Sequence, residues 1–235
     1  MHRDIGTTAG GNASLQQVEH IVWDWNGTLL DDNHANMAAL NQVCIEFGLP
    51  TVSLEYWRTV FRRPLRECYT ELLGHEPSDA EWEKVQVIYD AEYLRHLPDC
   101  GLVPEAPRAL KQWSGDGGSQ SLLSMASHEH LEPLVGQRGL TPHFTRVDGR
   151  RFDSPHDSKA EHLVHHLRGQ EQDPSRVVLI GDIDDDAHAA SAAGAQAVLV
   201  ARGLMARERL AATGHPVVDS VAEAVDFLRR LSWGT

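Results

Sequence analysis

The sequence predicts an α/β protein: a doubly wound parallel sheet with a helical segment inserted after the first strand. Short apolar runs alternate with segments of helical periodicity along most of the chain. This alternation is interrupted between residues 33 and 103, where only helical patterns occur. The length of 235 residues is sufficient for one large domain or for a core with a smaller insert. We therefore expect a sheet-based core and a separate group of helices.

The strands of the core are predicted from apolar runs typical of buried parallel strands. Because the connections between them are helical, the strands run parallel and their carboxyl ends meet at one edge. Open α/β sheets bind their ligands at that edge. Four runs are strong and two are weaker. The strong runs are 20–25, 121–126, 176–180 and 195–201, and the weaker ones are 144–147 and 217–218.

The helices are predicted from their end signals and periodicity. Three Ser-x-x-Glu sequences, which begin at Ser78, Ser158 and Ser220, match the capping box that starts a helix. Gly194 is the expected stop of an Ala-rich helix over 185–193.

The chain is predicted to divide into three parts. These are a loose tail at 1–17, a core at 18–32 and 104–235, and a helical insert at 33–103.

Composition restricts the partners and the compartment. The net charge of −13 argues against nucleic acid and anionic membrane surfaces, which are bound through Lys and Arg. The three cysteines are far apart, so we predict no disulfide framework and a reducing, cytoplasmic location. No apolar run is long enough to span a membrane. A small molecule is the expected partner, and the chain is expected to be a monomer or a homodimer.

Chemically capable residues occur where strands end or helices begin. The first strand ends in Asp24-Trp25-Asn26-Gly27-Thr28, and Ser124 ends the second strong run. Lys159 lies in the first turn of a capped helix. The run 176–180 is followed by Gly181-Asp182-Ile183-Asp184-Asp185-Asp186. If the strands are parallel, all of these residues meet at one edge of the sheet.

This combination suits phosphoryl transfer. A phosphate monoester is an anion that repels an attacking carboxylate such as Asp24, and Mg²⁺ offsets this repulsion. Asp24 and Asp182 would supply the oxygen ligands that Mg²⁺ prefers. A lysine and a serine hydroxyl would hold the remaining phosphate oxygens. The backbone amides of Gly27 and Thr28, at the start of a helix, would add donors.

The order and spacing of these motifs resemble the haloacid dehalogenase superfamily, and within it the phosphoglycolate-phosphatase-like branch, over residues 18 to 230. The resemblance implies a Rossmann-like core, with the insert as a helical cap of the C1 type. It implies that Asp24 is the nucleophile that forms an aspartyl-phosphate. Ser124, Met125 and Lys159 are the implied phosphate-binding residues. The implied metal ligands are Asp24, the Asn26 carbonyl and Asp182, with Asp186 as an indirect ligand or a partner of Lys159.

Asn26 departs from the family pattern, which usually has an aspartate that transfers protons at this position. The amide keeps the shape of that side chain but loses the proton chemistry, which is worth about 10²–10⁴ in rate. Three interpretations stay open. The protein is a phosphatase that is slow or uses another acid such as Asp31, Asp32 or His34. Alternatively it transfers phosphate to another acceptor, or it only binds phosphate.

The insert carries four arginines, Arg58, Arg62, Arg63 and Arg66, in an otherwise acidic chain. Arg62 and Arg63 are predicted to bind a carboxylate or a second phosphate of the substrate. A solvated amphipathic helix is the alternative.

The remaining acids and histidines receive simpler interpretations. Asp32 is predicted to cap the next helix, and Asp184 and Asp185 to face solvent or favour a helix start. His162, His165 and His166 suggest a metal site, but without an acid or cysteine at ligand spacing we expect exposed helix residues.

Overall fold

The computed structural model describes residues 17–152 and 158–233, so the predicted tail lies outside the described residues except for its last position. Within these ranges the core is a six-stranded parallel sheet in the order β3-β2-β1-β4-β5-β6. This arrangement confirms the predicted α/β fold. The strands are β1 (His20–Trp23), β2 (Ser119–Ser127), β3 (Val147–Arg150), β4 (Val177–Gly181), β5 (Gln196–Val200) and β6 (Val217–Val218).

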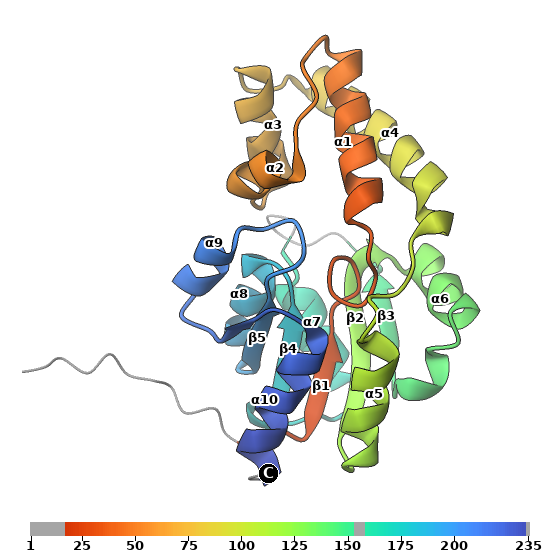
Figure 1. Ribbon diagram of the computed structural model, residues 1–235, viewed down its shortest axis with the longest axis vertical. Coiled ribbons are helices and arrows are strands. Elements are labelled where there is room, and N and C mark those ends of the chain that lie inside the picture. Colours follow the sequence, from red (N-terminus) through yellow and green to blue (C-terminus); the bar gives the residue numbers. More distant parts are fainter. Residues whose placement is uncertain (1–16, 153–157, 234–235) are drawn as a thin grey trace, which may run out of the picture.

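The helices fall into two groups (Figure 1). Between β1 and β2 the chain forms α1 (Asn33–Glu46), α2 (Leu54–Val60), α3 (Leu65–Leu73) and α4 (Asp79–His96). The helices that cover the sheet are α5 (Ala106–Gly115), α6 (His128–Gln137), α7 (Ala160–Arg168), α8 (Asp184–Ala193), α9 (Arg207–Ala212) and α10 (Val221–Trp233). Short 3₁₀ turns are η1 (Leu97–Asp99), η2 (Thr141–His143) and η4 (Pro174–Arg176).

Alternation along the buried strands divides the core between the two faces of the sheet. On β1, Ile21 and Trp23 belong to an apolar cluster with residues of α5, α6 and α10. Val22 belongs to a second cluster with residues of α7 and α8. Because both faces are covered, the strands are apolar almost throughout, as parallel strands usually are.

The helices α1 to α4 form a separate layer above the carboxyl edge of the sheet (Figure 1). Their interior is built from aromatic side chains: the ring of Trp57 lies edge-on to Phe61 and Tyr69. These residues belong to the same apolar cluster as the α7 and α8 face of the core. The layer corresponds to the predicted helical insert, whose limits at 33–103 stay a prediction.

The third strand lies later in the chain than predicted. The apolar run 144–147 suggested a strand, but η2 occupies 141–143 and β3 begins only at Val147. Phe144 packs against the core instead. The polar or small residues of β3 are buried because other elements bond them: His166 contacts Asp148, and the Gly149 amide donates to His128.

The predicted helix ends are correct where the capping residues are close to each other in the sequence. Ser78 and Glu81 form the predicted capping box, and Gly194 ends α8 with a positive φ of 76°. The box predicted at Ser158 does not form, because Lys159 rather than Ser158 stands at the N-cap of α7. The Ser158 hydroxyl donates to Asp185 on α8 and accepts from the Ala160 amide. In the described part of the chain, no helix has the length and apolarity needed to cross a bilayer.

Candidate active site

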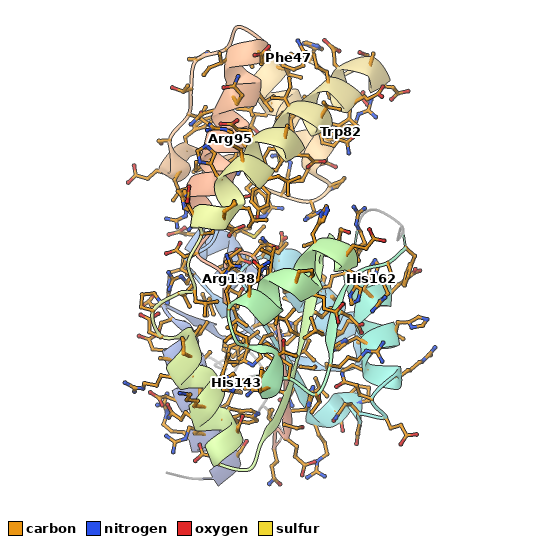
Figure 2. The ribbon with its side chains drawn as sticks, turned by 90° about the vertical axis from the view of Figure 1, so that its right-hand side faces the viewer. Phe47, Trp82, Arg95, Arg138, His143 and His162 are labelled. Carbon is orange, nitrogen blue, oxygen red and sulfur yellow. The ribbon has the colours of Figure 1, made fainter. Side chains whose placement is uncertain are left out.

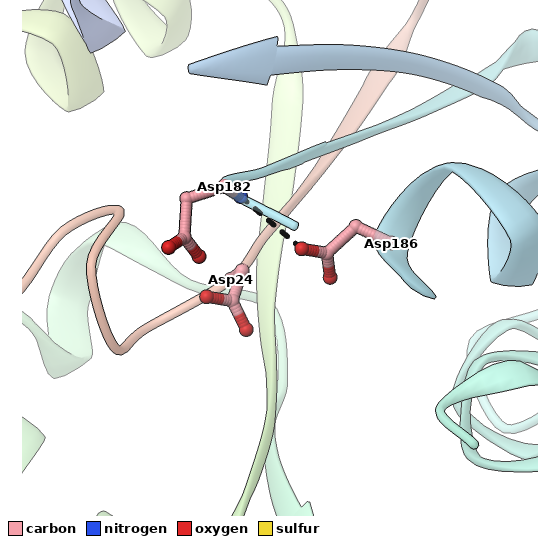
Figure 3. A group of neighbouring side chains, drawn as sticks. All are labelled: Asp24, Asp182 and Asp186. Carbon is pink, nitrogen blue, oxygen red and sulfur yellow. Dashed lines mark hydrogen bonds between the residues drawn. The ribbon is translucent and has the colours of Figure 1, made fainter. Parts of the chain in front are cut away.

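Three buried carboxylates meet at the carboxyl edge of the sheet (Figure 3). Asp24 follows β1 and Asp182 follows the neighbouring β4, where the Asp24 amide donates to the Ile180 carbonyl at 2.8 Å. Asp186 reaches the site from the first turn of α8. One oxygen of each carboxylate lies within 4.8 Å of one oxygen of each of the others. We call Asp24, Asp182 and Asp186, together with Lys159, the acidic cluster.

Lys159 supplies the positive charge of the cluster. Its Nζ lies 2.5 Å from Asp24 Oδ1 and 2.5 Å from Asp186 Oδ1, and the lysine side chain is buried. The residue stands at the N-cap of α7, where its backbone amide donates to Asp185 Oδ2 at 2.9 Å. Asp185, which we expected to face solvent or to favour the helix start, is buried and holds this end of α7.

The charges of the cluster are not balanced. Burial raises the pKa of Asp24 to about 6 against the opposing charge of Lys159, with a further rise from Asp186. Burial also raises the pKa of Asp182 well above its ordinary value, and Asp24 and Asp186 act in the same direction. Burial works against the Lys159 ammonium, but Asp186 and Asp24 outweigh it and raise the pKa of the lysine. A bound divalent cation would compensate this excess of negative charge, and oxygen ligands suit Mg²⁺.

Two glycines allow the backbone to close around Asp182. A Cβ at Gly27, whose φ is +73°, or at Gly203 would overlap the Asp182 carboxylate. Asp186 Oδ2 accepts from the amides of Asp182 and Ile183 at 3.1 and 3.2 Å, which holds the loop after β4 against α8. The position of Asp182 thus depends on chain segments before β2 and after β5.

The predicted phosphate-binding residues lie around Asn26. The Ser124 hydroxyl donates to Asn26 Oδ1 at 3.3 Å and accepts from the Ala126 amide at 3.1 Å. Thr28 is buried, and its hydroxyl has no hydrogen-bond partner among the described residues. Met125 follows Ser124 and is half-buried. Ser124 is therefore hydrogen-bonded to the Asn26 side chain, which is itself hydrogen-bonded to Tyr93 of the helical layer.

The Asn26 amide is held between the core and α4. Its Nδ2 donates to Asp32 Oδ2 at 2.8 Å and to the Tyr93 hydroxyl at 2.7 Å. Tyr93 donates to the same Asp32 oxygen at 2.8 Å, and Asp32 Oδ1 accepts from the Gly27 amide at 2.9 Å. Asp32 occupies the N-cap position of α1, as predicted, but its side chain does not cap that helix. It organises the turn that carries Asn26 instead.

The four arginines of the insert have different surroundings. Arg58 donates to the carbonyls of Gly203 and Arg202, both at 2.9 Å, and so ties α2 to the core loop beside Asp182. Arg62 pairs with Glu67 and Glu71 at 3.2 Å each. Arg66 pairs with Asp79 at 2.9 Å. Arg63 lies near enough to the half-buried Tyr89 for its charge to oppose the rise in the pKa of that phenol, a rise caused chiefly by burial of the hydroxyl.

The expectation that the α7 histidines are exposed was wrong for two of them. Only His165 is exposed, whereas His162 and His166 are buried. The His162 ring stacks on Phe152 with centroids 4.2 Å apart, and His166 Nδ1 lies 2.8 Å from Asp148 Oδ2. Both histidines lie beside the apolar Leu163 and Leu167 on the buried face of α7. This neighbourhood is visible in the sequence and could have predicted their burial.

Several contributors to the site were not predicted as such from the sequence. Tyr93 and Gly203 act through contacts with residues far away in the chain, and no local motif marks them. Arg58 was marked as one of four clustered arginines, but its partners, the carbonyls of Gly203 and Arg202, were not evident. Asp185 was marked by its place in the acidic run, but its partner, the Lys159 amide, was not evident.

Comparisons with known proteins agree with this geometry. A phosphoglycolate phosphatase of Chromobacterium violaceum is 25% identical over 226 residues, which cover 92% of this chain and 99% of that protein. The tyrosine-protein kinase PtkA of Mycobacterium tuberculosis is 23% identical over 211 residues, covering 89% of this chain and 70% of that protein.

Solved structures show the same fold. A putative phosphoglycolate phosphatase from Lactobacillus delbrueckii subsp. bulgaricus superposes with a TM-score of 0.77 at 18% identity, covering 91% of this chain and 99% of that one. A haloacid dehalogenase-like protein from Streptococcus pneumoniae gives a TM-score of 0.76 at 18% identity, with 89% and 98% covered. The family model for haloacid dehalogenase-like hydrolases matches residues 21–200, a range that contains the whole acidic cluster. The resemblance predicted from the motifs is thereby confirmed, and the chain belongs to the haloacid dehalogenase-like hydrolase family.

Proposed function

We propose that this protein is a Mg²⁺-dependent phosphatase that hydrolyses a small-molecule phosphate monoester through an aspartyl-phosphate on Asp24. One observation carries the proposal. Asp24 lies in a cluster of three buried carboxylates whose only close ammonium among the described residues is Lys159, 2.5 Å away. Such a cluster is costly for the fold unless a bound cation compensates its excess negative charge, and that cation can then hold an anionic ligand.

The residues divide the chemistry between them. Asp24, Asp182 and the Asn26 carbonyl would hold Mg²⁺, with Asp186 supporting the site. The bound metal supplies positive charge that offsets the repulsion between the carboxylates and the phosphate dianion. Lys159 and the Ser124 hydroxyl would bind phosphate oxygens, and Lys159 remains paired with Asp186. Thr28, whose buried hydroxyl has no hydrogen-bond partner among the residues that the structure describes, would belong to the same set.

In the first half-reaction an Asp24 oxygen bonds to phosphorus while the ester P–O bond breaks. The leaving oxygen takes a proton from water, because the Asn26 amide has none to give at neutral pH. In the second half-reaction water attacks the phosphorus, the bond to Asp24 breaks and phosphate leaves. The attacking water gives a proton to solvent, which replaces the proton that the leaving oxygen took. Asn26 contributes shape and hydrogen bonding only, so both steps proceed without general acid–base assistance worth about 10²–10⁴ in rate.

Relatives named phosphoglycolate phosphatases suggest a small substrate with a carboxylate beside its phosphate. We propose Arg63 for that second anion, because its charge acts on Tyr89, whereas Arg62 pairs with two glutamates on α3. The side of the insert that holds Arg63 also holds Tyr89, whose hydroxyl donates to Asn36 at 2.5 Å next to Asp32.

The test is phosphate release from phosphoglycolate, sugar phosphates, nucleotides and acyl phosphates, with Mg²⁺ and with EDTA. Wild type should release phosphate only with Mg²⁺, and Asp24→Asn should reduce release to background. Asp184→Asn is the matched control. Asp184 lies in the first turn of α8, as Asp186 does, but it pairs with Arg209 at 2.9 Å and does not belong to the acidic cluster. Equal activity of wild type and Asp24→Asn would refute the mechanism.

Phosphotransfer is the second candidate, favoured by the amide at position 26 and by the similarity to a kinase. Without a base, the aspartyl-phosphate would persist until an acceptor other than water arrives. A phosphoenzyme that is sensitive to hydroxylamine and decays faster with an added alcohol or tyrosine peptide than with water alone would support transfer. Decay at one rate regardless of acceptor would support hydrolysis.

A further inference from the structure

A chain of polar side chains, buried except for the half-buried Ser119 at one end, crosses the α7 face of the sheet below the acidic cluster. Ser119 Oγ lies 2.7 Å from His20 Nδ1, and His20 Nε2 lies 2.7 Å from Ser121 Oγ. Ser121 Oγ lies 2.7 Å from His166 Nε2, and His166 Nδ1 lies 2.8 Å from Asp148 Oδ2. These five residues, here called the polar chain, come from β1, β2, β3 and α7.

The direction of each hydrogen bond follows from the Asp148 end. An ionised carboxylate only accepts, so His166 Nδ1 must donate. Burial would raise the pKa of Asp148, but the hydrogen bonds from His166 and Arg146 outweigh this and lower it, which keeps the carboxylate ionised. Burial lowers the pKa of His166, which keeps the ring neutral, so its Nε2 accepts the Ser121 hydroxyl proton.

The same reasoning continues to the other end. Because the single Ser121 proton is given to His166, the Ser121 oxygen must accept from His20 Nε2. His20 Nδ1 then accepts from Ser119, at 2.7 Å a shorter contact than the 3.3 Å from the Ser119 hydroxyl to the Glu19 carbonyl. His166 is therefore the Nδ1–H tautomer and His20 the Nε2–H tautomer.

The group Ser121, His166 and Asp148 has the connectivity of a hydrolytic triad, but its serine cannot be a nucleophile here. Ser121 has no exposed surface, and its oxygen lies between two imidazoles. A reacting carbonyl has no access to it. The polar chain must act through the elements that it joins.

Those elements carry the residues of the proposed reaction. His166 lies seven positions after Lys159 on α7, which places both on the same helix face. Ser121 lies three positions before Ser124 on β2. The polar chain thus connects the helix that presents the lysine to the strand that presents the serine. The other end of this support is the Asp185 contact with the Lys159 amide.

We propose that Ser121 and His166 are positioning residues that hold α7 against β2 and thereby place the Lys159 ammonium between Asp24 and Asp186. The effect on turnover rests on the proposed phosphatase function, whereas the tautomers and the ordering of Lys159 do not. Lys159 neutralises charge on the nucleophile and on the transferred phosphate, so a displacement of its ammonium by about 1 Å is expected to reduce the rate by up to about 10²-fold.

The first experiment determines the tautomers by two-bond ¹H–¹⁵N correlation NMR of the histidine rings near pH 7. Ser121→Ala and the variants His20→Gln and His166→Gln assign the signals. We expect neutral Nδ1–H at His166 and neutral Nε2–H at His20. A charged His166, or the opposite tautomer, would reverse the chain toward the Glu19 carbonyl and overturn the inference.

The second experiment follows Lys159 directly, since the chain has only three lysines, Lys84, Lys111 and Lys159. The buried Lys159 ammonium should give a slowly exchanging ¹⁵Nζ signal in wild type. Ser121→Ala should remove or broaden it, and Ser121→Thr, which keeps the hydroxyl, should retain it. A signal unchanged in Ser121→Ala would refute the positioning role, whatever reaction the protein catalyses.

The matched control is Gln120→Leu. Gln120 is buried on the opposite face of β2, where it bonds Trp23 Nε1 at 2.8 Å and the Leu110 carbonyl at 2.9 Å. Both Ser121→Ala and Gln120→Leu should lower Tm. Only Ser121→Ala should lower kcat, by about tenfold with KM within about twofold, as expected for an interaction that acts in the transition state. Equal effects of the two variants on kcat would indicate a merely structural role.

Discussion

The acidic cluster and the polar chain both lie inside the core, next to β1 and α7, but they differ in whether their charges are compensated within the protein. The cluster brings three carboxylates to one ammonium, and burial raises the pKa of Asp24 to about 6. The polar chain has one carboxylate, Asp148, with His166 and the guanidinium of Arg146 as its partners. The four hydrogen bonds that link the members of the polar chain join protein groups only.

The difference separates a site that requires a ligand from a support that does not. Buried charge without sufficient compensation is unfavourable, so a cation from outside would compensate the cluster, and that cation could in turn hold an anion. A polar network whose members are all satisfied adds rigidity instead. Changes to the first should therefore alter ligand binding and turnover, whereas changes to the second should first alter stability and geometry.

The comparison is tested most severely by Asp182→Asn, which removes one carboxylate from the cluster. We expect Mg²⁺-dependent turnover to fall about a thousandfold, about 4 kcal/mol at 1.36 kcal/mol per tenfold. Mg²⁺ should raise the Tm of wild type but not that of the variant, since a ligand stabilises only a fold that binds it. Thermal unfolding with and without Mg²⁺ measures this, and an equal Mg²⁺ shift in both proteins would contradict it.

Asn26→Asp tests whether the position next to the acidic cluster tolerates another carboxylate. Asn26 Nδ2 lies 2.8 Å from Asp32 Oδ2, so an aspartate there would face a like charge. We expect the single variant to gain less than about tenfold in kcat, and Asn26→Asp with Asp32→Asn to gain about a hundredfold, the lower end of general acid–base catalysis. Steady-state phosphate release with the best substrate of the panel decides. A gain that is equal in both variants would show that Asp32 does not hinder the new acid.

The polar chain should be sensitive to acid. Burial lowers the pKa of His20 from 6.5 to about 4, with His166 contributing, so the folded protein keeps the ring neutral. The His20 ring of the unfolded chain binds a proton below pH 6.5, whereas that of the folded protein does so only near pH 4. The contribution of His20 to the free energy of unfolding is therefore complete above pH 6.5 and is lost as the pH falls toward 4. The loss is at most about 3 kcal/mol for His20. Urea unfolding of wild type and His20→Gln at pH 7 and pH 5 should show a smaller loss in the variant.

The smallest effect is expected outside both regions, at the arginines of the insert. Arg63→Ala should raise KM for the true substrate about tenfold with little change in kcat, as for one charge-assisted contact of 1–2 kcal/mol. Arg62→Ala is the matched control, because it removes ion pairs with Glu67 and Glu71 that are partly exposed and contribute little. An Arg62 effect larger than that of Arg63 would reverse the assignment.

Local patterns predicted what depends on local chemistry. The capping box at Ser78 needs only Glu81, three residues away, and it forms. The box at Ser158 fails because α7 has Lys159 at its N-cap, where Asp185 of α8 accepts from the Lys159 amide. His166 was predicted to be exposed because no partner was visible nearby. Its partners, Ser121 and Asp148, are 45 and 18 residues away and reach it only through the pairing of β2 with β3.

By itself the sequence determined the parallel α/β sheet and the meeting of Asp24, Ser124 and Asp182 at one edge. The reason is that parallel strands joined by helices align their carboxyl ends. Only the tertiary structure decided which arginine ties the insert to the core, what holds Asn26, and that the polar chain supports α7. Those outcomes depend on contacts between distant segments, whose partners are selected by packing and burial rather than by spacing along the chain.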